Sequence, residues 1–244
     1  MIQSYFKGKS SVDFYMDEDF KTSSSIGLLQ YLPDDIFWEI LRNSCNDLPS
    51  MDFGKIISFN FWEHTDPTGT TNTNFVEPDV WIETEGYDII IEAKIGDASG
   101  QYPTQWENEI LSIKNEQNNN DYEKPILLIA MGGNENMQPG IAAGCPVYKA
   151  SWYNLLNAIV NERNTKDENG CVCRILDDVI EMFARQGVLK IEWMNTLPER
   201  QYTINKCALN IWENHKIGFY AIHNEIINEK IILQWQPISQ WKNN

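Results

Sequence analysis

Residues 77–94 have the sequence EPDVWIETEGYDIIIEAK, in which two strand-like runs flank a Glu85-Gly86 dipeptide. We expect strands over residues 76–83 and 87–94, joined by a tight turn with Glu85 and Gly86 at its centre and a positive φ at the glycine. The three isoleucines at 89–91 predict that the second strand is buried in the middle of a sheet.

A two-residue turn fixes the register of a hairpin, so counting outward from Glu85 and Gly86 pairs Asp79 with Glu92. Directly opposed residues point to the same face of the sheet, with β-carbons about 5 Å apart. Lys94 lies two residues after Glu92 and therefore shares this face. The sequence predicts two carboxylates and a lysine side by side at one end of the hairpin.

Two opposed carboxylates repel each other, and a divalent cation between them would remove that repulsion. Ligation by oxygen alone favours Mg²⁺ or Mn²⁺ over zinc. Such an ion polarises a phosphoryl oxygen and activates a water, while a neighbouring lysine orients the water and offsets the developing charge. Asp79, Glu92 and Lys94 therefore indicate a metal-dependent phosphodiesterase.

The segments around this hairpin predict its fold class. We expect a polar arm over the first 22 residues, one or two helices over 25–45, a strand at 56–62, a helix at 102–116, and strands at 126–131 and 147–149. This order predicts an α/β layered domain with a mixed central sheet over residues 1–150. Two helices over 151–186 and a β-rich stretch over 188–236 predict a C-terminal α+β extension over residues 151–244.

The pattern of Pro-Asp, twelve residues, and Glu-x-Lys at the end of an apolar strand resembles the PD-(D/E)XK nuclease superfamily, which has the restriction-endonuclease-like fold. The resemblance covers roughly residues 25–150 and implies an αβββαβ core. It implies that Asp79 and Glu92 are metal ligands and that Lys94 is the catalytic lysine. Glu39 matches a further acidic ligand that many members add from the first helix. Gln105 matches a glutamine often found on the helix after the lysine.

By the same resemblance, we expect an endodeoxyribonuclease of the bacterial defence or DNA-processing type that binds DNA and uses Mg²⁺ or Mn²⁺. Many enzymes that cut both strands act as dimers, so a homodimer is one expected arrangement. Two alternatives stay open. One is a catalytically inactive member of the fold that serves binding or assembly, and the other is a nuclease that acts on RNA or on structured DNA.

The overall charge argues against a simple duplex-binding surface. The 244 residues include 19 Lys and Arg against 35 Asp and Glu, a formal net charge of −16. Such a surface repels a polyanion unless the substrate meets a local basic track or bridging metal ions. The basic residues are dispersed along the chain, so nucleic acid as the partner is an expectation that rests on the predicted site and not on the charge.

The chain contains neither an N-terminal leader pattern nor an apolar run of membrane-spanning length. We therefore expect a cytoplasmic protein without a membrane partner. Its five cysteines are scattered, and Cys171 and Cys173 lack the spacing and the second pair that a zinc site needs. We expect reduced thiols.

Overall fold

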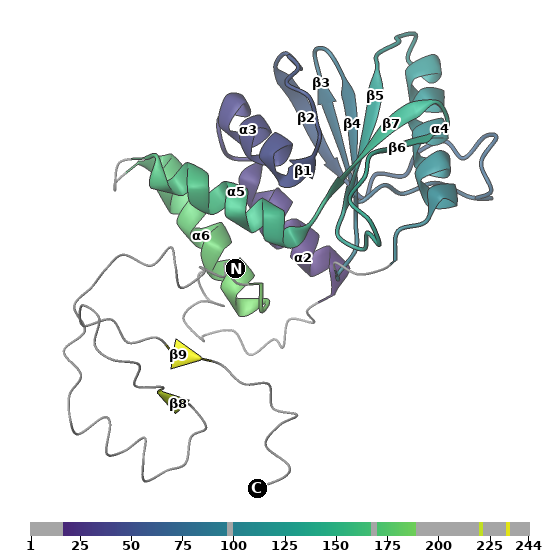
Figure 1. Ribbon diagram of the computed structural model, residues 1–244. Coiled ribbons are helices and arrows are strands. Elements are labelled where there is room, and N and C mark those ends of the chain that lie inside the picture. Colours follow the sequence, from purple (N-terminus) through teal and green to yellow (C-terminus); the bar gives the residue numbers. More distant parts are fainter. Residues whose placement is uncertain (1–16, 97–99, 167–169, 189–219, 222–232, 235–244) are drawn as a thin grey trace, which may run out of the picture. The chain divides into compact units, whose positions relative to one another are not determined.

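The computed structural model describes residues 17–96, 100–166, 170–188, 220–221 and 233–234 (Figure 1). The chain divides into two compact units, Met1–Lys190 and Ile191–Asn244. The elements of the first unit, in chain order, are α2 (Glu18–Leu29), α3 (Asp34–Ser44), β1 (Cys45–Asn46), β2 (Ile56–Phe61), β3 (Val80–Thr84), β4 (Asp88–Ala93), α4 (Pro103–Asn119), β5 (Ile126–Met131), β6 (Gly140–Ala142), β7 (Cys145–Ala150), α5 (Trp152–Asn164) and α6 (Cys171–Arg185).

The strands of the first unit form one mixed, open sheet of seven strands. Its order is β1-β7-β5-β4-β3-β2, and β6 pairs with β7. β4 lies in the middle, antiparallel to β3 and parallel to β5, and β5 is parallel to β7. The expected α/β fold with a mixed sheet is confirmed, and the strand expected at 126–131 has the same bounds in the structure.

The register of the β3–β4 hairpin is the one that the turn predicts. Val80 pairs with Ile91 and Glu83 with Asp88, so Asp79 and Glu92 are the next residues to face each other beyond the last pair. The predicted positive φ at Gly86 is wrong, because this glycine is not among the residues with left-handed backbone. Its N–H donates to the carbonyl of Phe53 at 2.8 Å, and a β-carbon would lie 3.0 Å from that oxygen. Glycine is needed at this position because the backbones of Gly86 and Phe53 approach each other closely.

Both faces of the sheet are covered by helices, α4 on one and α2, α3, α5 and α6 on the other (Figure 1). Alternate residues of β4 serve the two cores: Ile89 and Ile91 pack with the group of four helices, and Ile90 packs with Trp106 and Ile110 of α4. A strand buried on both faces has a continuous apolar run and no alternation. Glu92 follows Ile91 and therefore points to the α4 face.

The first described helix begins earlier than the sequence pattern indicates. We expect an arm over the first 22 residues, but α2 starts at Glu18. For residues 1–16 that prediction lies outside the described residues. Asp17 provides the reason: its side chain accepts a hydrogen bond from the N–H of Phe20 at 2.9 Å, and Glu18 and Asp19 occupy the first turn. An acidic N-cap followed by acidic residues stabilises a helix start. Because α2 begins at this point, Glu18 lies at the site described below.

The expected division after residue 150 differs from the division in the structure. Helices α5 and α6 lie in the first unit, where Leu155, Ile159 and Phe183 pack in the same core as the sheet. Of the expected β-rich stretch at 188–236, the structure describes one antiparallel pair, β8 (Tyr220–Ala221) with β9 (Leu233–Gln234). The rest of that prediction lies outside the described residues. Within the described ranges, no helix is long and apolar enough to cross a membrane.

Candidate metal centre at the end of strand β4

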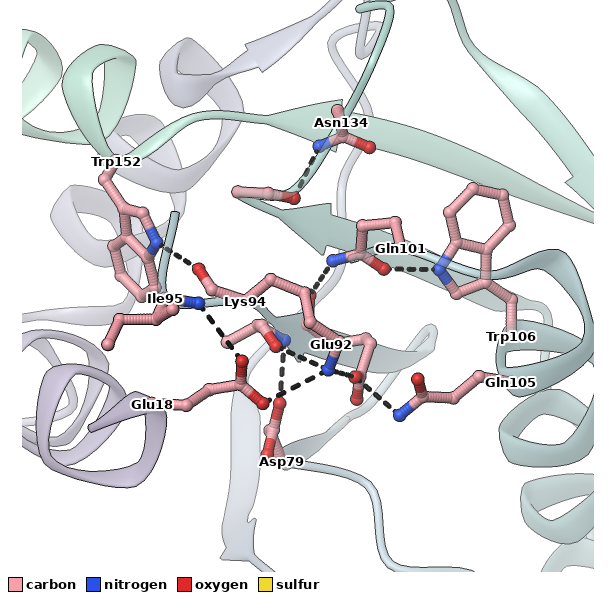
Figure 2. Close-up of polar contacts among 12 residues, drawn as sticks. Glu18, Asp79, Glu92, Lys94, Ile95, Gln101, Gln105, Trp106, Asn134 and Trp152 are labelled. Atoms are coloured by element: carbon pink, nitrogen blue, oxygen red, sulfur yellow. Dashed lines mark hydrogen bonds and ion pairs between the residues drawn. The ribbon is translucent and has the colours of Figure 1, made fainter. Parts of the chain in front are cut away.

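Asp79, Glu92 and Lys94 meet at the carboxyl end of β4, on the face covered by α4 (Figure 2). Oδ2 of Asp79 accepts a hydrogen bond from the backbone N–H of Ala93 at 2.7 Å. Asp79 is 8% exposed and Glu92 is 1% exposed, so both carboxylates are buried. The structure thus brings together the three residues that the hairpin predicts.

The ammonium of Lys94 lies between oxygen atoms from three residues. It donates to Oε1 of Glu92, to the carbonyl of Ala93 at 2.9 Å and to Oε1 of Glu18 at 3.2 Å. Burial opposes the charge on Lys94, but the carboxylates of Glu92 and Glu18 outweigh it and raise the pKa of the lysine. The neighbouring carboxylates therefore favour the charged form of Lys94.

Glu18 occupies the place that the sequence assigned to Glu39. It lies in the first turn of α2, and its Oε2 accepts from the N–H of Ile95 at 3.1 Å. One helical turn later, Lys21 donates to the carbonyl of Ile95 at 2.8 Å. The start of α2 is therefore fixed on the backbone that follows Lys94.

Glu39 is not part of this site. It lies on α3, where its carboxylate accepts from Arg42 at 2.6 Å and from Asn43 at 3.0 Å, and it lines a cavity against α5. The guanidinium of Arg42 holds the pKa of Glu39 below its usual range. An i,i+3 ion pair on a helix surface accounts for this glutamate, and the acidic residue from a preceding helix is Glu18.

Two glutamines fix Glu92 from the side of α4. Gln105 donates to Oε1 of Glu92 at 2.6 Å, so the residue expected on this helix does lie at the site. Gln101, which the sequence did not single out, donates to the backbone carbonyl of Glu92 at 2.9 Å and accepts from the indole of Trp106 at 2.6 Å. Both the backbone and the side chain of Glu92 are held by amides, and one carboxylate orientation results.

The backbone of Lys94 is fixed as firmly as its side chain. Its N–H donates to the carbonyl of Met131 at 2.8 Å, and its carbonyl accepts from the indole of Trp152 at 2.7 Å. Gly132 passes directly against this backbone with a φ of +72°, and Gly133 donates to the carbonyl of Gly96 at 2.6 Å. Lys94 is thus positioned by the end of β5 and the start of α5.

A fourth carboxylate, Glu109, lies beside these residues and was missed in the sequence. It is 1% exposed on α4, and its Oε2 has no hydrogen-bond partner. Burial and the neighbouring carboxylates of Glu92 and Asp79 raise the pKa of Glu109 well above its usual range. Burial and the charge of Glu92 likewise raise the pKa of Asp79 to about 8. The centre has more negative groups than Lys94 neutralises.

A cation fits this arrangement on its donor set. Glu18, Asp79 and Glu92 each offer a carboxylate oxygen, and these atoms lie within 4.8 Å of one another. All the donors are oxygens, which Mg²⁺ and Mn²⁺ prefer. Burial and the neighbouring carboxylates raise the pKa values of Asp79 and Glu109, as expected where several acids share one lysine.

The fold and the site define a class: an α/β protein with a buried centre of carboxylates and one lysine at the end of its central strand. Comparison of the chain with protein-family models, with curated proteins and with solved structures gives no match.

The raised pKa of Asp79 predicts a pH dependence of folding in the absence of metal. The unfolded chain releases this proton near pH 4, whereas the folded protein holds it to about pH 8. The folded state binds more protons between these values, so the free energy of unfolding should fall as the pH rises through this window, by about 2–5 kcal/mol. Urea unfolding in EDTA at several pH values measures this loss.

The Asp79→Asn variant should show a shallower decline, since an amide keeps the hydrogen bond from Ala93 and has no proton to lose. Asp66→Asn, at a partly exposed carboxylate whose pKa is lowered by its hydrogen bonds with Thr68, is the matched control and should decline like the wild type. Equal slopes for Asp79→Asn and the wild type would show that Asp79 does not hold a proton in the folded state.

Proposed function

We propose that this protein is a Mg²⁺-dependent phosphodiesterase that cuts DNA, an endodeoxyribonuclease. The observation that carries the proposal is the convergence of Glu18, Asp79 and Glu92 on the ammonium of Lys94 at the end of a buried strand. Two opposed carboxylates, a third acid and a charged lysine on one face supply cation ligands and a group for the substrate's negative charge.

A restriction-endonuclease-like core is part of the same proposal. Supporting it is the element order, in which α3 is followed by the antiparallel strands β2, β3 and β4, then by α4, and then by β5 parallel to β4. The candidate residues lie on the hairpin and on the helix after it, as in the superfamily that the sequence resembles. Glu18 departs from the expected pattern, because it comes from α2 and not from the helix that carries Glu39.

Glu18, Asp79 and Glu92 would hold the cation, with the carbonyl of Ala93 close by. When bound, Mg²⁺ supplies positive charge at a phosphoryl oxygen and makes a water acidic enough to attack at neutral pH. Lys94, which Glu18 and Glu92 hold at this place, would contact the phosphoryl group, where its ammonium would offset the negative charge of the transition state. Gln105 keeps the carboxylate of Glu92 in place during this exchange. Burial strengthens each of these interactions, because they act in a medium of low dielectric constant.

A second candidate function is a non-catalytic binding or assembly protein, and two observations favour it. The ion pairs of Lys94 with Glu18 and Glu92 already give two of the carboxylates a partner without metal. The net charge of −16 also suits a basic protein partner better than a polyanion. This candidate predicts that the site takes up no divalent cation.

Titration calorimetry with Mn²⁺ separates the two functions. The wild-type protein should bind Mn²⁺, and Glu18→Gln should weaken binding by at least about tenfold, because it removes a charged ligand. Glu39→Gln is the matched control, since it alters a glutamate on the neighbouring helix α3 that is paired with Arg42, and it should bind like the wild type. Failure of the wild type to bind Mn²⁺ would leave the non-catalytic function. Weaker binding only in Glu39→Gln would restore the ligand set predicted from the sequence.

A further inference from the structure

A groove opens directly beside the candidate metal centre. It lies along the first half of α4, faces the loop between β2 and β3, and has a volume of about 310 Å³. Gln105 and Glu109 belong to both the groove and the metal centre. Pockets that hold small ligands have volumes from about 300 Å³ upward, so the groove accommodates a group of nucleotide size next to the carboxylates.

The wall opposite α4 is held in place by hydrogen bonds and does not depend on a ligand. Asn108 of α4 accepts from the N–H of Thr71 at 3.1 Å and donates to the hydroxyl of Thr71 at 2.7 Å. About two turns further along α4, Asn115 donates to the carbonyls of Asp66 at 3.0 Å and of Thr68 at 2.8 Å. The loop is therefore tied to the helix at Asn108, which lines the groove, and again at Asn115 beyond it, so the wall opposite α4 is preformed.

The groove has few charged groups. No lysine or arginine lines it in the described part of the chain, and of its two glutamates Glu77 is paired with His64 at 2.7 Å. Duplex DNA binds mainly through lysine and arginine contacts to several phosphates. This groove does not offer such contacts, so a double helix has little to hold it here.

The start of α4 supplies the positive end of a helix dipole without using a side chain. Pro103 is the first residue of the helix, no side chain caps it, and its first turn has no acidic residue. Helix N-termini bind phosphate groups through partial positive charge and N–H groups. Pro103 has no N–H and the N–H of Gln105 donates to the carbonyl of Tyr102 at 3.0 Å, so of the first three residues of α4 Thr104 is the one that offers an N–H to a ligand. Glu109 also lines the groove, but its carboxyl group is buried beside Glu92 and belongs to the metal centre.

An aromatic side chain stands at the same helix start. Tyr102 is 63% exposed, although a tyrosine ring of this size gains from being covered. Thr104, Gln105 and Asn108 follow it along the groove and offer neutral hydroxyl and amide groups. A flat exposed ring followed by neutral hydrogen-bonding groups suits an unpaired base, which stacks on the ring and bonds through its edges.

We propose that the groove binds an unpaired, single-stranded segment of nucleic acid, with a base stacked on Tyr102 and a phosphate at the start of α4. This inference rests on the proposed function, because the strand leads to the metal centre through Gln105 and Glu109. It gives the proposed enzyme single strands, or unpaired regions of a duplex, as substrate. Base stacking is the part of such binding that a net charge of −16 does not oppose.

Fluorescence anisotropy with labelled oligonucleotides tests this inference. A 12-nucleotide oligo-dT, a 12-nucleotide oligo-U and a 12-base-pair DNA duplex are titrated with the full-length protein in Ca²⁺ to limit cleavage. We expect either single strand to bind at least tenfold more tightly than the duplex, and the two single-stranded arms to separate DNA from RNA. Tyr102→Ala should weaken single-strand binding by roughly 5- to 150-fold, the effect of losing one stacked base.

Two further variants test whether weaker binding comes from the groove or from a general loss of structure. Tyr31→Ala removes a tyrosine that is 69% exposed at the end of α2 and should bind like the wild type. Thr104→Glu places a negative charge in the first turn of α4, which stabilises the helix but repels a phosphate. It should weaken binding without lowering the melting temperature. Duplex binding equal to single-strand binding, or an unchanged affinity in Tyr102→Ala, would overturn the inference.

A parallel cleavage assay in Mn²⁺ keeps failure of this inference distinct from failure of the proposed function. Cleavage of duplex without a preference for single strands would refute the groove assignment and leave the phosphodiesterase intact. Single-strand binding that depends on Tyr102 but produces no cleavage would support the groove and refute the phosphodiesterase. Failure of every oligonucleotide to bind would overturn the groove assignment.

Discussion

Lys94→Met should lower the rate of DNA cleavage in Mn²⁺ by about 10²–10³-fold while the protein still binds Mn²⁺. Removing one preorganised group that stabilises transition-state charge has an effect of about this size. The carboxylates of Glu18 and Glu92 stay in place, so cation binding should be retained. Single-turnover cleavage of a labelled oligonucleotide measures the rate, and calorimetry measures the binding.

The metal-free form of Lys94→Met is expected to be less stable, because Glu18 and Glu92 lose the partner they have in this structure. Breaking a buried ion pair on one side costs about 3–5 kcal/mol. Activity should therefore be compared in saturating Mn²⁺, with circular dichroism to show that the variant is folded. Lys114→Met is the matched control: this lysine of α4 donates to the carbonyl of Ala143 and should not affect cleavage. Cleavage by folded Lys94→Met at the wild-type rate would remove Lys94 from the mechanism.

Gly132→Ala should destabilise the protein by about 2–5 kcal/mol, the sum of a left-handed backbone penalty and a collision in a packed region. A β-carbon at this position would lie 2.6 Å from the carbonyl oxygens of Lys94 and Gly96 and 2.7 Å from Nε1 of Trp152. Two of these three contacts hold the backbone of Lys94, so activity should fall together with stability. Urea unfolding gives the stability change.

Gly144→Ala separates the two contributions. Gly144 has a φ of +79°, similar to the +72° of Gly132, but nothing lies within 4 Å of its added β-carbon. This variant should lose only the backbone contribution, about 1–2 kcal/mol. Equal losses in the two variants would mean that the surroundings of Gly132 adapt and that the tight contact with Lys94 is not required.

The local part of the site was predictable from the sequence. A two-residue turn and the alternation of side chains fix which residues of β3 and β4 share a face, and the pairing of Val80 with Ile91 confirms that count. The side chain of Gln105 also lies where the resemblance places it, because it comes from the helix that follows the hairpin directly. Predictions that depend on neighbouring elements of the chain were the successful ones.

The position of Glu18 could not be obtained in this way. It reaches the site from 74 residues before Glu92, and its location depends on how α2 packs against the sheet and against α6, where Gln186 donates to Ser24 at 2.7 Å. Asp17 and Glu18 indicate where a helix starts, but not which part of the protein that helix packs against. Glu39 was assigned from resemblance alone, and the nearby Arg42 accounts for it.

Glu109 was within reach of sequence reasoning. It lies four residues after Gln105 on α4, and residues at that spacing share a helix face. An acid on the face that carries Gln105 therefore belongs near Glu92. The sequence does not show that Glu109 is buried. Burial leaves Oε2 of Glu109 without a hydrogen-bond donor and raises the pKa of the carboxyl group.

Cleavage of DNA by the purified wild-type protein tests the central claim most directly. Supercoiled plasmid and single-stranded circular DNA are incubated with the full-length chain in Mn²⁺, with EDTA in a parallel reaction. We predict metal-dependent cutting that EDTA abolishes, that Lys94→Met lowers to near background, and that is faster on the single-stranded circle. Intact DNA of both kinds, in a sample that calorimetry shows to be loaded with Mn²⁺, would contradict the claim that this centre is a phosphodiesterase.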